Sequence, residues 1–339
     1  MFDLIYVEEE ARDHPRTREI LARLPKATVV PCDRYGEVFN PRAQDFRLQK
    51  RSSALILAQK HGNLILEAPT GYGFPGAANW YLSPSLNCVY DCRYCFLQGM
   101  YASAHVVVFV NHEDFARAID AQVVRADTAR DARPQWFFSG YDGDSLALEP
   151  LGRFTESILP TFERLPGAWL ELRTKSAKIE VLESRAPLPN VVTAMSFTPQ
   201  AAGDRWENGV PPVARRIETI ERVGSRGWPL GLRLDPLLTF PGWREAYRTL
   251  IDQLFARLRP AWIHSVSVGA FRLPRDMHRA IRRLYPEEPL FSAGLADEDG
   301  VVSYEREARA EIETFVRREL EHHVPASVIV SCRPRIEAA

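Results

Sequence analysis

The sequence predicts an α/β fold: a partial (β/α)6 TIM-type barrel on a mostly parallel sheet, with N- and C-terminal extensions packed on it. From about residue 77 onward, apolar runs typical of strands alternate with amphipathic stretches typical of helices. This alternation is characteristic of parallel strands joined by right-handed crossovers. The chain has room for about six such units, so we expect an open barrel instead of a closed one. Its 339 residues, 45% of them hydrophobic, can bury a core of that size.

The predicted elements follow in order along the barrel. The expected strands cover residues 78–83, 105–110, 135–139, 168–173, 191–196, 229–234 and 262–268. Amphipathic helical stretches follow most of them, at 112–122, 146–164, 213–223, 243–257 and 275–285. In parallel α/β folds the ligands bind at the carboxyl ends of the strands. We therefore expect the functional site at that edge of the sheet.

The chain is predicted to have three parts: an N-terminal α/β extension (1–76), the barrel (77–270), and C-terminal helices with a hairpin and a final strand (271–339). Residues 4–24 have the pattern of a strand followed by a helix. The tail has the pattern of a long charged helix at 304–322 and a last strand at 327–332. Neither end shows a linker, so we expect both to pack on the barrel instead of forming independent domains.

Composition and charge limit the classes of function that the protein can have. The net charge is −1, so no global field attracts the protein to nucleic acid or to a membrane, although a local basic patch can still do so. The N-terminus has neither a basic region nor an apolar core of a signal peptide, and no run approaches the roughly 20 apolar residues of a membrane span. We expect a soluble cytoplasmic protein without a membrane partner.

Three of the five cysteines lie within eight residues, at Cys88, Cys92 and Cys95, with the spacing C-x3-C-x2-C. An odd number of cysteines, clustered in this way, argues against a disulfide framework. Cysteine thiolates hold iron–sulfur clusters, usually four to a cluster. Three close thiolates predict a [4Fe–4S] cluster with one iron left open for the amino and carboxylate groups of S-adenosylmethionine (SAM). The alternative is a zinc site with a remote fourth ligand, but zinc favours paired C-x2-C units, and no second pair is present.

The cysteine motif resembles the signature of the radical SAM superfamily. The run CRYCFLQ followed by VVVFVN looks like the spore photoproduct lyase family. The resemblance extends over about 300 residues and includes YVEEEARDHPRTREIL, LQKRSSALILAQK, ELRTKS and MSFTP. It implies reductive cleavage of SAM to a 5′-deoxyadenosyl radical, with a flavodoxin- or ferredoxin-type electron donor. The radical would remove hydrogen from C6 of a 5-thyminyl-5,6-dihydrothymine lesion in DNA, so that the thymines separate without light.

The resemblance also assigns SAM-binding residues. Lys175 matches the family lysine that contacts SAM, and Ser196 matches the corresponding serine. A lysine at a strand end can pair with the methionine carboxylate. The turn from Gly140 to Asp144 falls where radical SAM proteins hold the methionine amino group, with Asp142 and Asp144 as the acceptors. The alternative for each of these residues is an ordinary polar group at a strand end.

The sequence departs from the family at the hydrogen donor. The family uses a cysteine near the end of the second barrel strand, whereas no cysteine lies between Cys95 and Cys332. By position Tyr141 takes its place, and a phenol can also give a hydrogen atom. Tyr94 retains a family tyrosine, while Phe96 replaces a second tyrosine and has no O–H to give. We expect Tyr141 and Tyr94 to return hydrogen, with simple packing as the alternative for Tyr141.

The DNA-binding features are weaker than in the family. Where the family has a basic hairpin, residues 293–300 read AGLADEDG, and acidic groups repel phosphate. The remaining basic candidates are Arg42, Arg47, Lys50, Arg51, Arg272, Arg275, Arg279, Arg282 and Arg283. This leaves a second hypothesis, a radical SAM enzyme acting on another nucleotide, RNA or a small molecule. A third is a non-enzymatic iron–sulfur or zinc protein that binds nucleic acid as a sensor.

Overall fold

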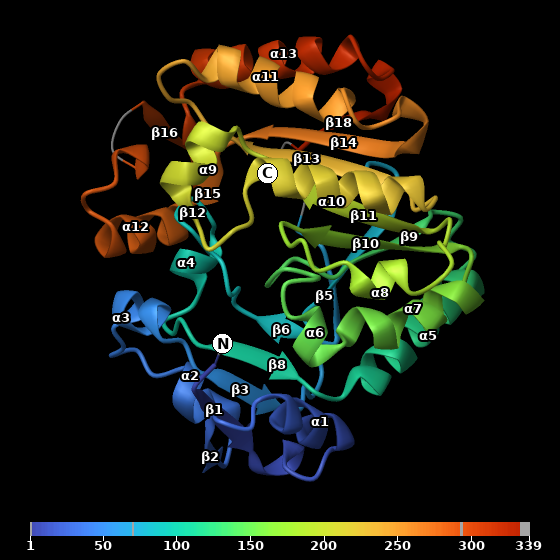
Figure 1. The fold of residues 1–339 in the computed structure, drawn as a ribbon, viewed down its shortest axis with the longest axis vertical. Helices are drawn as coiled ribbons and strands as arrows, with labels where there is room; N and C mark the ends of the chain where they lie inside the picture. Colours follow the sequence, from blue (N-terminus) through green and yellow to red (C-terminus); the bar gives the residue numbers. More distant parts are fainter. Residues whose placement is uncertain (1, 70, 292–293, 333–339) are drawn as a thin grey trace.

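A computed structural model describes residues 2–69, 71–291 and 294–332. Two sheets and a small three-stranded sheet form its framework (Figure 1). The larger sheet has eight strands in the order β18-β14-β13-β11-β10-β9-β5-β4. Its members are β18 (Ile329–Ser331), β14 (Ile263–Ala270), β13 (Leu230–Leu237), β11 (Val191–Ser196), β10 (Ala168–Thr174), β9 (Gln135–Phe138), β5 (Ala78–Leu82) and β4 (Ile65–Glu67).

The larger sheet confirms the predicted open partial barrel. Every neighbouring pair is parallel except β4 with β5, and the two edge strands, β4 and β18, do not meet. β9 and β11 are buried along their whole length, as expected for parallel strands covered on both faces. In Figure 1 the sheet is curled, with helices along its outer face.

The helices pack through regular apolar stripes. On α10 (Val213–Ser225), the residues Val213, Ile217, Ile220 and Val223 are all buried, at the i, i+4, i+7 spacing of one helix face. The remaining barrel helices are α5 (His112–Thr128), α6 (Glu149–Gly152), α7 (Phe154–Arg164), α8 (Glu180–Glu183), α9 (Gln200–Trp206) and α11 (Trp243–Phe255). The predicted helix 146–164 is in fact two helices, because Arg153, between α6 and α7, has a left-handed φ of 56°.

The N-terminal sheet corrects one prediction. Its order is β2-β1-β3-β8-β6, with β2 (Thr28–Cys32), β1 (Leu4–Glu8), β3 (Leu55–Ala58), β8 (Val106–Phe109) and β6 (Ser85–Leu86). The strand predicted at 105–110 is present as β8, but it lies here and not in the barrel. A short apolar run predicts a buried strand without saying which sheet it joins. This sheet also carries the helices α1 (Pro15–Arg23), α2 (Tyr35–Phe39) and α3 (Phe46–Arg51).

The C-terminal part packs on the barrel, where α13 (Arg306–Glu321) contacts α11 and β14. Before α13 it contains β15 (Arg272–Pro274), α12 (Arg275–Leu284), β16 (Leu295–Glu298) and β17 (Val301–Tyr304). β15, β17 and β16 form an antiparallel sheet, and α12 packs on α4 (Leu97–Met100), the helix directly after the cysteines. Within the described ranges, no helix is long and apolar enough to span a membrane.

Candidate active site

One cavity of about 360 Å³ lies at the carboxyl ends of the barrel strands, where the fold predicts a ligand site. It brings together nine of the ten residues predicted from the sequence. The predicted residues that line it are Cys88, Cys92, Cys95, Tyr94, Gly140, Tyr141, Asp144, Lys175 and Ser196. Asp142 does not line the cavity.

The cysteine loop is held in place by its backbone. β7 (Asp91–Cys92) pairs antiparallel with β12 (Glu207–Asn208), so Cys92 lies opposite Glu207. Next to this pair, the Arg93 amide donates to the Trp206 carbonyl at 2.8 Å. From the other side, Lys50 Nζ donates to the Cys88 carbonyl at 3.0 Å. These contacts fix the loop independently of any bound group.

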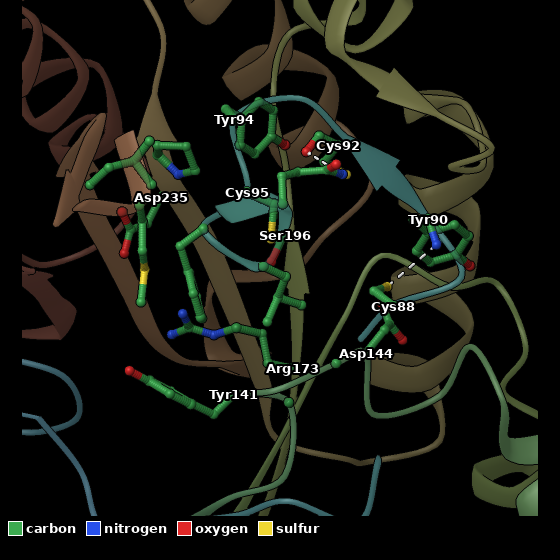
Figure 2. Close-up of a pocket in the computed structure, with 18 of the residues that line it drawn as sticks. Cys88, Tyr90, Cys92, Tyr94, Cys95, Tyr141, Asp144, Arg173, Ser196 and Asp235 are labelled. Carbon is green, nitrogen blue, oxygen red and sulfur yellow. Dashed lines mark hydrogen bonds between the residues drawn. The ribbon is translucent and has the colours of Figure 1, made fainter. Parts of the chain in front are cut away.

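The three cysteines are buried, so their thiolate forms need a positive charge nearby, and the iron of a bound cluster would supply it. Burial raises the pKa of all three, to about 12 at Cys88 and well above the ordinary value at Cys92. Lys175 opposes this at Cys92 and Cys95. Figure 2 shows the cysteines around one side of the cavity. Among the described residues, no three His, Cys, Asp or Glu side chains converge on a single ion. A cubane differs, because each thiolate binds a different iron.

A buried charge network joins the predicted SAM residues. Glu207 accepts hydrogen bonds from the Tyr94 hydroxyl and, at 2.7 Å, from Arg216 Nη2, and its carboxylate lies 3.9 Å from Lys175 Nζ. Arg216 Nη1 also donates to the Ser196 carbonyl at 2.8 Å. Although burial raises the pKa of Glu207, Lys175 and Arg216 outweigh it, so the carboxylate is ionised. Sequence reasoning missed Glu207 and Arg216.

The two candidate aspartates have different environments. Asp144 Oδ1 accepts from the Leu146 and Ala147 amides and the Thr174 hydroxyl, and Oδ2 accepts from the Lys175 amide, all at 2.6–3.0 Å. Asp144 thereby ties the turn after β9 to the end of β10. Asp142 instead accepts a hydrogen bond from Ser83, and burial raises its pKa.

Gly140 allows the turn after β9 to approach β10 closely. A Cβ atom at this position would lie 2.6 Å from the Arg173 carbonyl oxygen and 3.0 Å from Ser145 Oγ. No side chain fits at the first of these distances without a backbone shift. Gly140 is therefore required for the shape of the cavity wall.

Tyr141 lies in an aromatic cluster. Its ring centroid is 4.4 Å from Tyr81, 5.0 Å from Tyr72 and 5.4 Å from Phe96. No hydrogen bond joins its hydroxyl to any described residue, and burial raises its pKa to about 12. The hydroxyl is therefore protonated and available. Tyr94, in contrast, is 4% exposed and its hydroxyl is engaged with Glu207.

A second group of charged residues lines the cavity away from the cysteines. Arg173, Asp235 and Arg272 are its members. The sequence did not predict Arg173 and Asp235 as site residues. Arg272 was predicted as one of the basic candidates for nucleic-acid contact, but it lies in β15 on the cavity wall and not on the helix with the other arginines. Behind Arg173, Glu171 accepts from Arg173 Nε at 3.0 Å and from Arg233 at 2.7 Å. A signal for this group was present in ELRTKS, where charged residues two apart in a buried strand share one face.

The acidic hairpin is less acidic than its sequence indicates. Asp297 pairs with Arg275, and Glu298 pairs with Arg309 at 3.0 Å. Asp299 lies in the turn between β16 and β17, with a left-handed φ of 50°. Ala293, the first residue of the predicted stretch, lies outside the described residues. The basic residues Arg279, Arg282 and Arg283 on α12 are exposed.

Comparisons with known proteins agree with this geometry. A family model described as spore photoproduct lyase matches residues 1–329. The spore photoproduct lyase of Bacillus subtilis (strain 168) is 22% identical over 298 residues, covering 85% of this chain and 83% of the relative. The spore photoproduct lyase of Geobacillus sp. (strain Y412MC61) is 20% identical over 293 residues, which again cover 85% of this chain and 83% of the relative. A solved spore photoproduct lyase variant with bound AdoMet and dinucleoside spore photoproduct has a TM-score of 0.82 at 19% identity, covering 98% of both chains.

Proposed function

Since the chain belongs to the spore photoproduct lyase family, whose members are radical SAM lyases, we propose that it binds a [4Fe–4S] cluster through Cys88, Cys92 and Cys95 and repairs a spore-photoproduct-type thymine lesion in DNA. The observation that carries this proposal is that the three cysteines, Lys175 and Ser196 line the same cavity. A cluster held by these cysteines would, once reduced, supply the electron for cleavage of SAM to methionine and a 5′-deoxyadenosyl radical, and that radical would remove a hydrogen atom from C6 of the lesion.

The chain's own residues bind and orient the reactants. Lys175, 16% exposed at the end of β10, pairs with the carboxylate of SAM. Ser196 and the turn from Gly140 to Asp144 flank the same space. Asp144 acts by holding the Lys175 backbone, since both of its oxygens already accept hydrogen bonds.

Tyr141 gives its phenolic hydrogen atom to the product radical, and the phenoxyl radical left on Tyr141 is restored by one electron from the electron donor and one proton from solvent. Its unbonded hydroxyl and its place on the cavity wall support this role. Phe96, with which its ring is in contact, cannot pass the radical on through an O–H. Tyr94 is the remaining family tyrosine, and its hydroxyl donates to Glu207. We propose a flavodoxin- or ferredoxin-type protein as the electron donor.

The absence of a cysteine at the donor position supports one alternative: a radical SAM enzyme acting on another nucleotide, RNA or a small molecule. Its product radical would need a different partner, and a tyrosine in place of the thiol fits that need. The substrate separates the two functions, while the cluster and SAM are common to both.

The test is anaerobic reduction of the reconstituted protein with dithionite, SAM and a synthetic spore-photoproduct dinucleotide. Chromatography measures 5′-deoxyadenosine and released thymine dinucleotide. We expect both from the wild-type protein and neither from Cys92→Ala, with Cys332→Ala as the control. Deoxyadenosine without repair would favour the alternative substrate, and neither product from an intact cluster would contradict the enzyme function.

A further inference from the structure

Three charged side chains form a group on the cavity wall opposite the cysteines. Arg173 lies near the end of β10, Asp235 lies near the end of β13, and Arg272 is the first residue of β15, with one residue between it and the end of β14. All three line the cavity. In Figure 2 Arg173 lies near Tyr141, and Asp235 lies across the view from Cys88. They therefore face the part of the cavity that a substrate would occupy beside SAM.

Arg173 presents free donors to this space. Its Nε donates to Glu171 Oε1 at 3.0 Å, and its guanidinium carbon lies 5.1 Å from the centre of the Tyr72 ring. These contacts fix the plane of the guanidinium. Neither terminal amino group has a hydrogen-bond acceptor among the described residues, although the side chain is only 20% exposed. Neither amino group is a fully buried atom, so both are accessible from the cavity and free to donate to a ligand oxygen.

Asp235 and Arg272 supply an acceptor beside a donor. Arg272 Nη1 and Nη2 donate to the two oxygens of Asp235 at 2.8 and 3.3 Å. The side chains are 12% and 24% exposed. A carboxylate has about four lone-pair positions, so Asp235 can still accept a hydrogen bond from a ligand. An Arg has five N–H groups, so Arg272 can still donate.

The charges around this wall do not balance. Three guanidinium groups, those of Arg173, Arg233 and Arg272, face two carboxylates, those of Glu171 and Asp235. Arg233 is fully occupied behind the wall, since it donates to Glu171 and to the Ser265 carbonyl and hydroxyl. The excess positive charge therefore lies at the surface of the cavity, where electronegative oxygens of a ligand would compensate it.

We propose that Arg173, Asp235 and Arg272 bind the imide edge of a pyrimidine in the substrate. Two donors, Arg173 and Arg272, and one acceptor, Asp235, are the groups needed to bind the two carbonyls and the N3–H of a thymine or uracil ring. A cytosine-type edge would place an amino group against an arginine and a bare N3 against the carboxylate. This inference rests on the proposed function and names the groups that select its base.

The test uses the holoenzyme, reconstituted with cluster and SAM, in equilibrium binding with the dinucleoside spore photoproduct and its N3-methylated derivative. We expect the methylated ligand to bind about ten- to a hundredfold more weakly, the scale of one lost base-edge contact. In Asp235→Leu the two ligands should bind almost equally, because the side chain can no longer accept a hydrogen bond from N3–H. A steric clash with the methyl group would persist in this variant, since Leu is close to Asp in size. Arg164→Gln, a change of an exposed side chain on α7, is the control.

Two further measurements separate the outcomes. 5′-Deoxyadenosine is measured in every sample, so loss of SAM cleavage identifies failure of the proposed function. Equal binding of both ligands by an active wild-type enzyme would overturn the imide assignment. The same ligand carrying its phosphodiester is titrated in parallel with Arg173→Gln. A loss of affinity confined to that form would make the wall a phosphate site and also overturn the assignment.

Discussion

Arg216 Nη2 donates a 2.7 Å hydrogen bond to Glu207 Oε2, and both side chains are 1% exposed. Because Glu207 also accepts from Tyr94 and lies opposite Cys92 in the β7–β12 pair, this ion pair supports the cysteine loop. Removing one charge leaves the other buried without its partner. We expect Glu207→Gln to lower the free energy of unfolding by about 3–5 kcal/mol, measured by denaturant titration of the cluster-free protein.

Glu218→Gln is the matched control for this change. Glu218 lies on α10, as Arg216 does, and pairs with Arg215 at 2.8 Å, but both side chains are almost half exposed. Such surface pairs contribute about 0–1 kcal/mol. Equal losses of stability in the two variants would contradict a supporting role for the Glu207–Arg216 pair.

Asp144 and Asp142 should respond oppositely to the loss of their charge. Asp144→Ala removes an acceptor of four hydrogen bonds and should lower the free energy of unfolding by about 2–4 kcal/mol. Burial raises the pKa of Asp142, so its ionised form is disfavoured in the fold. We expect Asp142→Asn at pH 7 to be neutral or stabilising. Thermal unfolding of both variants checks this, and a larger loss for Asp142→Asn would contradict it.

The sequence predicted those parts of the site that depend on local spacing or on a common sheet edge. Cys88, Cys92 and Cys95 are close in the chain, so their spacing alone predicts convergence. Lys175 and Ser196 meet them because parallel strands end at the same edge of the sheet.

The rest of the site depends on contacts between distant segments. Glu207 joins the site through the two-residue strand β12, and no period or spacing reveals that pairing. Asp235 and Arg272 are 37 residues apart and meet only because β13 and β14 are neighbours. The barrel was predicted because strand and helix alternate. The sheet that β8 joins depends on its neighbours and not on its own apolar residues.

Replacing Tyr141 with Phe should separate radical generation from repair. The ring contacts remain but the O–H is lost, so 5′-deoxyadenosine should still form. Repaired thymine dinucleotide should fall on the order of tenfold or more. Because the pKa of Tyr141 is about 12, hydrogen return by the wild-type enzyme should not change between about pH 7 and pH 10. Tyr81→Phe is the control, since Tyr81 packs against Tyr141 without lining the cavity. Full repair by Tyr141→Phe would exclude it as the donor.

His112 should make the fold sensitive to mild acid. It is 2% exposed, and its Nδ1 accepts from Arg16 Nε at 2.8 Å. Burial, followed by the charge of Arg16, lowers its pKa well below 6.5. The unfolded chain therefore binds a proton first as the pH falls through about 6.5, and stability decreases below that pH by up to about 1.4 kcal/mol per pH unit. Denaturant titrations at pH 7.5 and 5.5 measure this loss. His112→Asn should reduce it, whereas exposed His322→Asn should not.

The exposed arginines of α12 should contact DNA outside the cavity. Met277 on this helix lines the cavity, and α12 packs on α4 directly after the cysteine loop, so its exposed face, with Arg279, Arg282 and Arg283, flanks the entrance. Changing all three arginines to Gln should weaken binding of lesion-containing duplex DNA. It should also reduce the slope of log K against log salt by about 2–3, because each phosphate contact contributes about 0.9.

The dinucleoside lesion and a second surface provide the controls for α12. The dinucleoside has no phosphodiester, so its affinity should not change in the triple variant. Arg117→Gln with Arg125→Gln removes charge from the exposed face of α5, and this variant should keep the wild-type salt dependence. A slope that falls equally in both variants would mean that DNA responds to total charge and not to a surface on α12. If the slope falls only in the α12 variant, the duplex lies across this helix while the lesion enters the cavity.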